Sequence, residues 1–189
     1  MKTHRLTLPL TKLLLAAAIL AIPIARPCRA QYAIGTTYSA SHLRVEPGFY
    51  YPNNIAEAWV FGPTFSFQLE EGSKHIKFGF DARGAVLRGS SNGSNYGVNS
   101  ADYGFRVAVP IHPLHVKPYG EFLIGYVGVH NGLSSAQYTG HIDLQTIAGI
   151  DVPLRHHLDL RAIEYAYGGI FGGGEDFRNQ ISSGLLVRF

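Results

Sequence analysis

The last nine residues, Ile181-Ser182-Ser183-Gly184-Leu185-Leu186-Val187-Arg188-Phe189, decide the fold because two kinds of side chain alternate along them. The odd-numbered positions carry Ile, Ser, Leu, Val and Phe, whereas the even-numbered positions carry Ser, Gly, Leu and Arg. A repeat of two residues is the repeat of a β-strand, whose successive side chains point to opposite faces. The stretch therefore predicts a strand with one apolar face and one largely polar face.

The same alternation recurs upstream and gives eight candidate strands in total. They span about residues 33–45, 59–69, 75–86, 102–111, 119–126, 142–151, 158–167 and 180–189. These lengths are close to the roughly 9 to 11 residues that a tilted strand needs to cross a bilayer. No stretch after residue 30 is apolar over the ~20 residues that a membrane-spanning helix needs.

The connections between these segments alternate in length. Short ones are expected at 71–74, 112–115 and 154–157, and long polar or Gly-rich ones at 47–57, 89–100, 131–140 and 168–177. Outer-membrane barrels have short periplasmic turns and longer outside loops. The pattern therefore places both chain ends on the periplasmic side.

The composition of the two faces favours a barrel in lipid over a soluble sheet. Large aromatic side chains gather on the apolar face, whereas the opposite face is rich in Gly, Ser and Thr with isolated charges. In hydrocarbon every backbone polar group must be paired, so such a sheet has to close on itself. We predict an all-β fold, an eight-stranded antiparallel up-and-down transmembrane barrel; a soluble sandwich or lipocalin-like barrel is the alternative.

Aromatic side chains at the strand ends predict two girdles at the membrane interfaces. Tyr119 is the exception, because its parity is that of a lumen residue and it needs a local twist to join a girdle. The outer girdle is predicted to contain Trp59, Tyr103, Tyr126 and Tyr167, and the inner one Phe67, Phe78, Tyr119 and Phe189.

Residues 1–30 have the three zones of a secretory signal peptide: a basic start, an apolar run over 13–25 and a polar tail. Cleavage is expected after Ala30, so the barrel domain spans 31–189 and begins at Gln31. A lipoprotein with Cys28 as its first residue is the alternative, but Arg26 and Pro27 stand where small apolar residues would be needed. Five of the 16 basic residues and none of the 13 acidic ones belong to this segment, so the remaining chain is slightly acidic and nucleic acid is not an expected partner.

The inward face gathers charges that would be costly in a narrow lumen unless they pair across it. A salt-bridged plug is the expected arrangement, and a gated small-ion path is the alternative. Strict alternation from Leu158 places Glu164 on the lipid side, although a bulge after Arg161 would return it to the lumen. The predicted lumen network comprises Lys77, Asp81, Arg83, Arg106, Glu121, Asp143, Arg161 and Arg188, with Asp102, Asp151 and Asp159 on the same face.

With these features the chain resembles the eight-stranded outer-membrane β-barrel superfamily, which includes the transmembrane domain of outer membrane protein A. The most specific motif is the ending, with Leu185, Val187 and the terminal Phe189 at alternating positions. In this superfamily such an ending is read by the barrel assembly machinery, so the resemblance implies that machinery and outer-membrane lipids as partners. Superfamily membership does not imply one function, because its members include structural proteins, adhesins and lipid-modifying enzymes.

Catalysis and cofactors are not expected. Lipid A deacylases of this barrel size carry a His-x-Ser motif, and none of the nine His residues is followed two positions later by Ser. No acidic or Cys residues complete a metal shell around the His residues in the short turns. We therefore predict an integral outer-membrane protein with a structural or surface-interaction role; an outer-leaflet lipid-modifying enzyme is the second hypothesis and a narrow gated channel the third. The long loops, with Tyr50-Tyr51-Pro52-Asn53-Asn54, are the expected site for an extracellular ligand.

Overall fold

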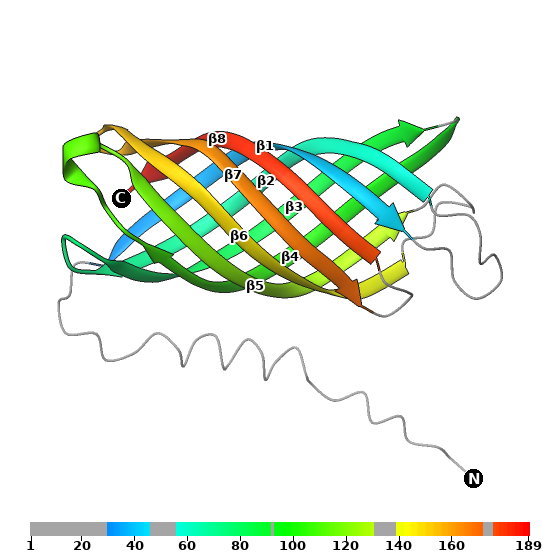
Figure 1. Ribbon diagram of the computed structural model, residues 1–189, viewed down its shortest axis with the longest axis horizontal. Coiled ribbons are helices and arrows are strands. Elements are labelled where there is room, and N and C mark those ends of the chain that lie inside the picture. The colour runs from blue at the N-terminus through cyan, green and yellow to red at the C-terminus, as the bar shows by residue number, and fades with distance from the viewer. Residues whose placement is uncertain (1–29, 46–55, 92, 131–138, 172–175) are drawn as a thin grey trace, which may run out of the picture.

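The chain forms a single closed barrel of eight antiparallel strands (Figure 1). The computed structural model describes residues 30–45, 56–91, 93–130, 139–171 and 176–189. The strands are β1 (Gln31–Val45), β2 (Ala56–Gly72), β3 (Lys77–Ser91), β4 (Ser94–Ala108), β5 (Lys117–His130), β6 (Thr139–Arg155), β7 (Leu158–Phe171) and β8 (Asp176–Arg188). Each strand pairs with its sequence neighbours, as predicted for an up-and-down barrel. Within the described residues, no helix is long and apolar enough to cross a membrane.

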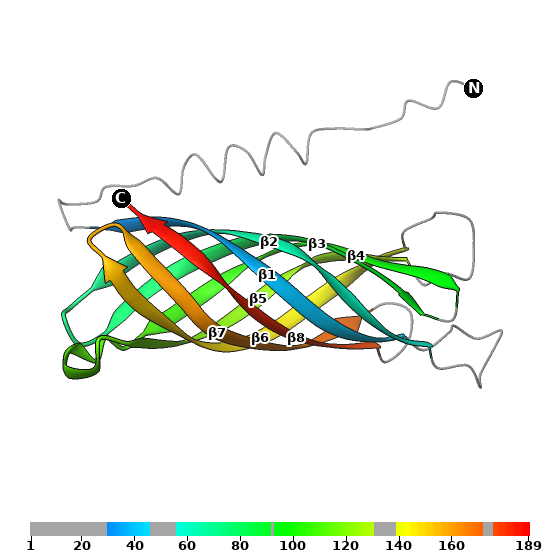
Figure 2. The ribbon, with the colours of Figure 1, turned by 90° about the horizontal axis from the view of Figure 1, so that it is seen from above.

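Pairing between β1 and β8 closes the barrel, from Ala33 opposite Arg188 to Arg44 opposite Phe177. The backbone N–H of Phe189 continues this seam by donating to the carbonyl of Tyr32 at 2.8 Å. Figure 2 shows β1 and β8 running side by side along the barrel. The sheet therefore has no unpaired edge along the seam, which is the condition for a β-structure in hydrocarbon.

Tight connections gather at the end of the barrel where β1 starts and β8 finishes (Figure 1). Ser73 makes the β2–β3 turn by accepting hydrogen bonds from the N–H groups of His75 and Ile76, both at 3.2 Å. A short 3-10 helix, η1 (His112–Leu114), joins β4 to β5, and residues 156–157 join β6 to β7. This is the end predicted to be periplasmic.

The predicted alternation is present in the strands, with aromatic and aliphatic side chains outside and smaller or polar ones inside. Phe65, Phe105 and Phe122 are more than half exposed, whereas Ser39, Asp81 and Arg106 are buried. The strands are longer than predicted, from 13 residues in β8 to 17 in β2 and β6. The outer face is therefore apolar over much of the barrel height, and the polar face is turned inward.

The predicted long loop at 89–100 is wrong, because most of these residues continue the β3–β4 hairpin to the pair Ser91–Ser94. Two inward side chains of this extension, Tyr96 and Val98, are buried inside the barrel and hold it there. The Asn92-Gly93 dipeptide is a strong hairpin signal, and Gly93 adopts a φ of +77° that other residues rarely take. The Ser and Asn residues of 89–100 give this segment the composition of a loop, but its side chains alternate between the two faces as in a strand.

Gly184 allows the closing strands to approach each other, since it lies opposite Thr37 of β1. A Cβ atom at this position would lie 2.5 Å from the Cα atom of Thr37. We expect Gly184→Ala to lower the free energy of unfolding by about 2 kcal/mol, because the backbone of the seam must move. Urea unfolding of the folded protein in detergent, followed by heat-modifiable gel migration, measures the loss.

Gly120→Ala is the matched control, because a Cβ atom there would lie 3.8 Å from the carbonyl oxygen of Ile147, an ordinary contact. This variant is expected to unfold at the wild-type urea concentration or slightly above it. Equal destabilisation by the two substitutions would contradict the role of close approach at the seam.

Candidate functional site

The lumen of the barrel holds a network of buried ion pairs. Its centre is the Arg106 guanidinium on β4, which donates to Glu70 on β2 at 2.7 Å, to Glu121 on β5 and to Asp151 on β6 at 2.5 Å. All four side chains are buried. One planar cation thus ties together four strands, which suits the fixed fork of donors in arginine.

A second arginine, Arg83 on β3, extends the network across the barrel. It donates to Asp81 at 3.0 Å, to Glu164 on β7 at 2.6 Å and to Glu121. Glu121 therefore lies between the two arginines and joins their clusters. Arg161 on β7 closes a ring by pairing with Glu164 at 3.1 Å and with Asp151 at 3.2 Å.

Tyr119 lies inside this ring, so its placement in the inner girdle is wrong. Its hydroxyl donates to Glu164 at 2.6 Å, and the guanidinium carbon of Arg106 lies 3.6 Å from the centre of its ring. The phenol thus serves both as a hydrogen-bond donor and as a cation–π partner in the lumen. In the sequence, only the place of Tyr119 in the two-residue alternation indicated that its side chain points into the lumen.

Glu164 faces the lumen because β7 contains a β-bulge. The register of β7 against β8 shifts between Arg161 and Glu164, and the intervening Ala162 and Ile163 both face outward. Ser183 supports the bulge by donating to the carbonyl oxygens of Arg161 at 3.0 Å and Ala162 at 3.2 Å. The β-bulge after Arg161, which an inward Glu164 requires, is therefore present. It adds one more carboxylate to the network.

At the mouth predicted to be periplasmic, the network ends in ion pairs of which only Lys77 and Arg188 are partly exposed. Lys117 lies 3.1 Å from Glu70, and Lys77 donates to Gln31 at 2.8 Å and lies 3.8 Å from Glu70. Arg188 pairs with Asp159 at 2.8 Å. The predicted residues Lys77 and Arg188 thus lie at the rim, whereas Asp81, Arg83, Arg106, Glu121 and Arg161 lie in the buried centre.

Asp143 is the one predicted network residue that belongs to a separate cluster. Its carboxylate accepts from Gln145 at 2.7 Å and pairs with Arg178 on β8 at 3.1 Å, and Asp102 lies 3.9 Å from the same arginine. All of these side chains are buried. Across the described residues, no group of three or more His, Cys, Asp or Glu side chains is placed to hold a metal ion.

Sequence reasoning missed three members of the lumen set, Glu70, Lys117 and Arg178. Each lies one or two residues beyond the end of a predicted strand and keeps the inward parity of that strand. If the predicted strands had been one or two residues longer, they would have included all three charges. A missed strand end thus removed a charge from the predicted network, although the alternation itself was correct.

An apolar layer lies inside the barrel beside the Asp143–Arg178 cluster, where Leu43 is the cross-strand neighbour of Arg178 and Ile170 that of Asp143; no pattern noted in the sequence predicted it. Its members come from β1 to β5 and β7 and have almost no exposed surface. They include Leu43, Val60, Leu87, Val98, Val127, Val129 and Ile170, together with Tyr96. An eight-stranded barrel is just wide enough for side chains to fill its interior, so this layer and the ion pairs close the lumen together.

These features define the class of protein: an eight-stranded β-barrel of the outer-membrane type, with an apolar outer face and a filled lumen. Solved structures with a similar fold include neisserial surface protein A, with a TM-score of 0.56 and 16% identity over 83% of this chain and 99% of that one. Ail, the attachment invasion locus protein of Yersinia pestis, has a TM-score of 0.54 and 16% identity over 85% of this chain and 99% of that one. No protein-family model and no curated protein sequence matches the chain. At these identities the likeness establishes the shared fold.

Removing one buried arginine tests the network. We expect Arg106→Met to lower the free energy of unfolding by about 3 to 5 kcal/mol, because Glu70, Glu121 and Asp151 would lose their shared cation inside the barrel. Equilibrium unfolding in urea of the protein refolded in detergent measures this change.

Arg188→Met is the matched control, since the Arg188 side chain is 18% exposed at the rim and Lys117 also lies near its partner Asp159. Its expected loss is about 1 kcal/mol or less. If both variants lost the same amount, the buried network would not be a main source of stability.

Proposed function

We propose that this chain is exported, is cleaved after Ala30 and acts in the outer membrane as a non-catalytic barrel whose surfaces, and not its lumen, carry its role. The observation that carries this proposal is the closed lumen. Ion pairs around Arg106 fill its centre, and an apolar layer that includes Leu87 and Val98 fills the part beyond them. A barrel without an open path is not a channel, and its role then lies on its faces and outer connections.

The surface-interaction part of the proposal rests on the sequence of the outer connections. Tyr50-Tyr51-Pro52-Asn53-Asn54 offers phenol and amide groups that bind glycans or proteins by hydrogen bonds, but these residues lie outside the described ones. Ail is named for attachment and invasion, and neisserial surface protein A for its place at the cell surface. These names agree with a barrel that presents a binding surface.

Two readouts on one preparation separate this role from the channel and the enzyme. The full mature barrel, reconstituted with lipid A, is expected to leave a planar bilayer electrically silent, because apolar side chains seal the lumen. Mass spectrometry of the lipid A after incubation is expected to show every acyl chain unchanged. A pore-forming porin in the same bilayers is the positive control for conductance.

Each alternative has a defined signature in that experiment. Discrete current steps that change in Arg106→Met would establish a channel through the network. A reproducible loss or gain of an acyl chain would establish a lipid-modifying enzyme instead. Either result overturns the proposal.

Recognition by the barrel assembly machinery is proposed for the end of β8. Leu185, Val187 and Phe189 all face outward and are exposed, and Phe189 is the most exposed at 70%. The backbone hydrogen bond from Phe189 to Tyr32 does not need the phenyl ring. The ring is thus available to a partner while the backbone closes the seam.

We expect Phe189→Ala to reduce several-fold the amount of heat-modifiable barrel that forms in membranes containing the purified assembly machinery. Refolding in detergent without the machinery is expected to give the wild-type yield. Phe122→Ala, which removes an exposed outward phenyl ring from β5, is the matched control and should assemble normally. A similar defect in both variants would mean that apolar surface in general, and not the terminal ring, is recognised.

A further inference from the structure

Polar side chains interrupt the lipid-facing surface where β2, β1, β8 and β7 lie side by side. Cross-strand register aligns Trp59 with His42, His42 with Asn179, and Asn179 with Tyr167. All four residues have the outward parity of their strands. His42 lies three residues before the end of β1, and Asn179 three residues after the start of β8, so the row is near the outer rim.

The two aromatic ends of this row indicate its depth in the membrane. Trp and Tyr favour the interface between headgroups and acyl chains, so Trp59 and Tyr167 place the row at the interface of the outer leaflet. Between them, His42 and Asn179 present polar atoms toward lipid. A polar group in such a place is costly unless it has a hydrogen-bond partner.

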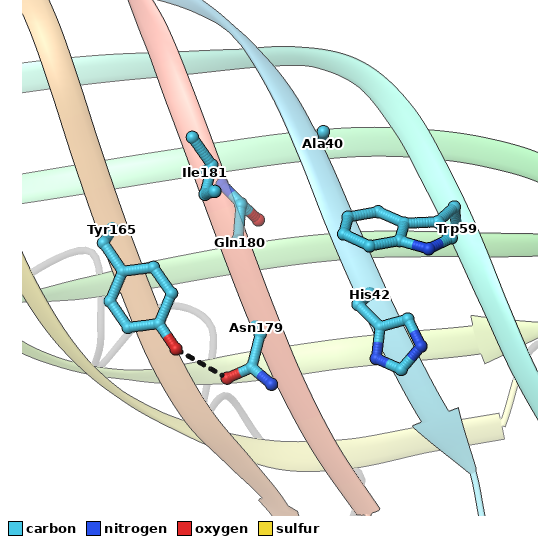
Figure 3. A pocket seen from close by; sticks show the side chains of 7 residues that line it. All are labelled: Ala40, His42, Trp59, Tyr165, Asn179, Gln180 and Ile181. Carbon is cyan, nitrogen blue, oxygen red and sulfur yellow. Dashed lines mark hydrogen bonds between the residues drawn. The ribbon is translucent and has the colours of Figure 1, made fainter.

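A groove of about 310 Å³ borders the row on its side nearer the start of β1, and Trp59, His42 and Asn179 of the row help to line it (Figure 3). Its floor is Ala40 beside Ile181, which are paired neighbours on β1 and β8. Trp59 and His42 stand on one side, and Tyr165 stands on the other (Figure 3). The small Ala40 side chain thus leaves an apolar floor between aromatic walls.

At the head of the groove the amide of Asn179 is oriented as a donor. The Tyr165 hydroxyl donates to the Asn179 Oδ1 atom at 3.1 Å, which turns the amide nitrogen of Asn179 toward other acceptors. The His42 ring lies 5.1 Å from the Trp59 ring, and its Nε2 atom is 3.8 Å from Glu57. One row further out, the exposed Arg44 has the same outward parity and lies opposite Glu57 of β2 in the register.

We propose that this groove binds one phosphate-bearing, acylated glycolipid of the outer leaflet. An acyl chain lies over Ala40 and Ile181, a linkage carbonyl accepts from Asn179 and His42, and a phosphate faces Arg44. The row from Trp59 to Tyr167 crosses four strands, or about 14 Å at the usual strand spacing, which matches a sugar headgroup with several chains better than a single glycerol. The site goes beyond the surface role proposed above but rests on the barrel lying in the outer membrane.

Trp59 is the only tryptophan of the chain and lines the groove, so its fluorescence reports directly on occupancy. The folded barrel is reconstituted in phosphatidylcholine vesicles and titrated with lipid A. We expect a saturable change in Trp59 emission in the wild type. Ala40→Leu, which fills the floor, and Asn179→Leu, which removes the donor, should raise the half-saturating mole fraction about fivefold.

Ala82→Leu is the matched control, because Ala82 is an exposed outward residue on β3, away from the groove, and should titrate like the wild type. Three outcomes overturn the site: an equal response to phosphatidylethanolamine, no saturable response, or wild-type titration by both groove variants. Heat-modifiable migration of every sample separates the two levels of failure. A folded, inserted barrel without a response contradicts the glycolipid site alone, whereas a chain that never becomes heat-modifiable contradicts the membrane barrel itself.

Discussion

Pairing of the first and last strands is the constraint on which the rest of the structure depends. In hydrocarbon an unpaired backbone N–H or C=O group is too costly to leave exposed, so the sheet must close. Eight strands close into a barrel whose interior admits side chains and little else. The hydrogen bonds between β1 and β8, continued by Phe189, therefore determine both that the chain can lie in lipid and that its lumen is narrow.

A narrow lumen in turn explains why its charges are arranged as a network. A carboxylate there has lost most of its water, and a single lysine would satisfy it incompletely. Arg83 and Arg106 each face three carboxylates and share Glu121, so several strands are joined through two planar cations. Lysines occur instead at the mouth where β1 starts, where Lys77 remains partly exposed to water.

Because side chains fill the lumen, the groups that can contact other molecules lie on the outside of the barrel. The outer face is not uniformly apolar: His42 and Asn179 interrupt it between Trp59 and Tyr167 and line one end of a groove. The lumen and the outer face thus accommodate polar groups in opposite ways. Inside, charge is neutralised within the chain, whereas outside the polar groups near the rim face the membrane and its headgroups.

The residue pattern alone was enough to establish the strand number, the inward and outward faces and the identity of most lumen charges, because a two-residue repeat is local and each strand displays it. The ends of the strands were harder to predict from the sequence. Ser and Asn near residues 90–95 have loop composition, while Tyr96 and Val98 are held by side chains from other strands. The same error at other ends hid Glu70, Lys117 and Arg178. Only the tertiary structure decided the side of Glu164, the ring position of Tyr119 and the partners of each arginine, because a bulge and a cross-lumen contact depend on strands that are distant in sequence.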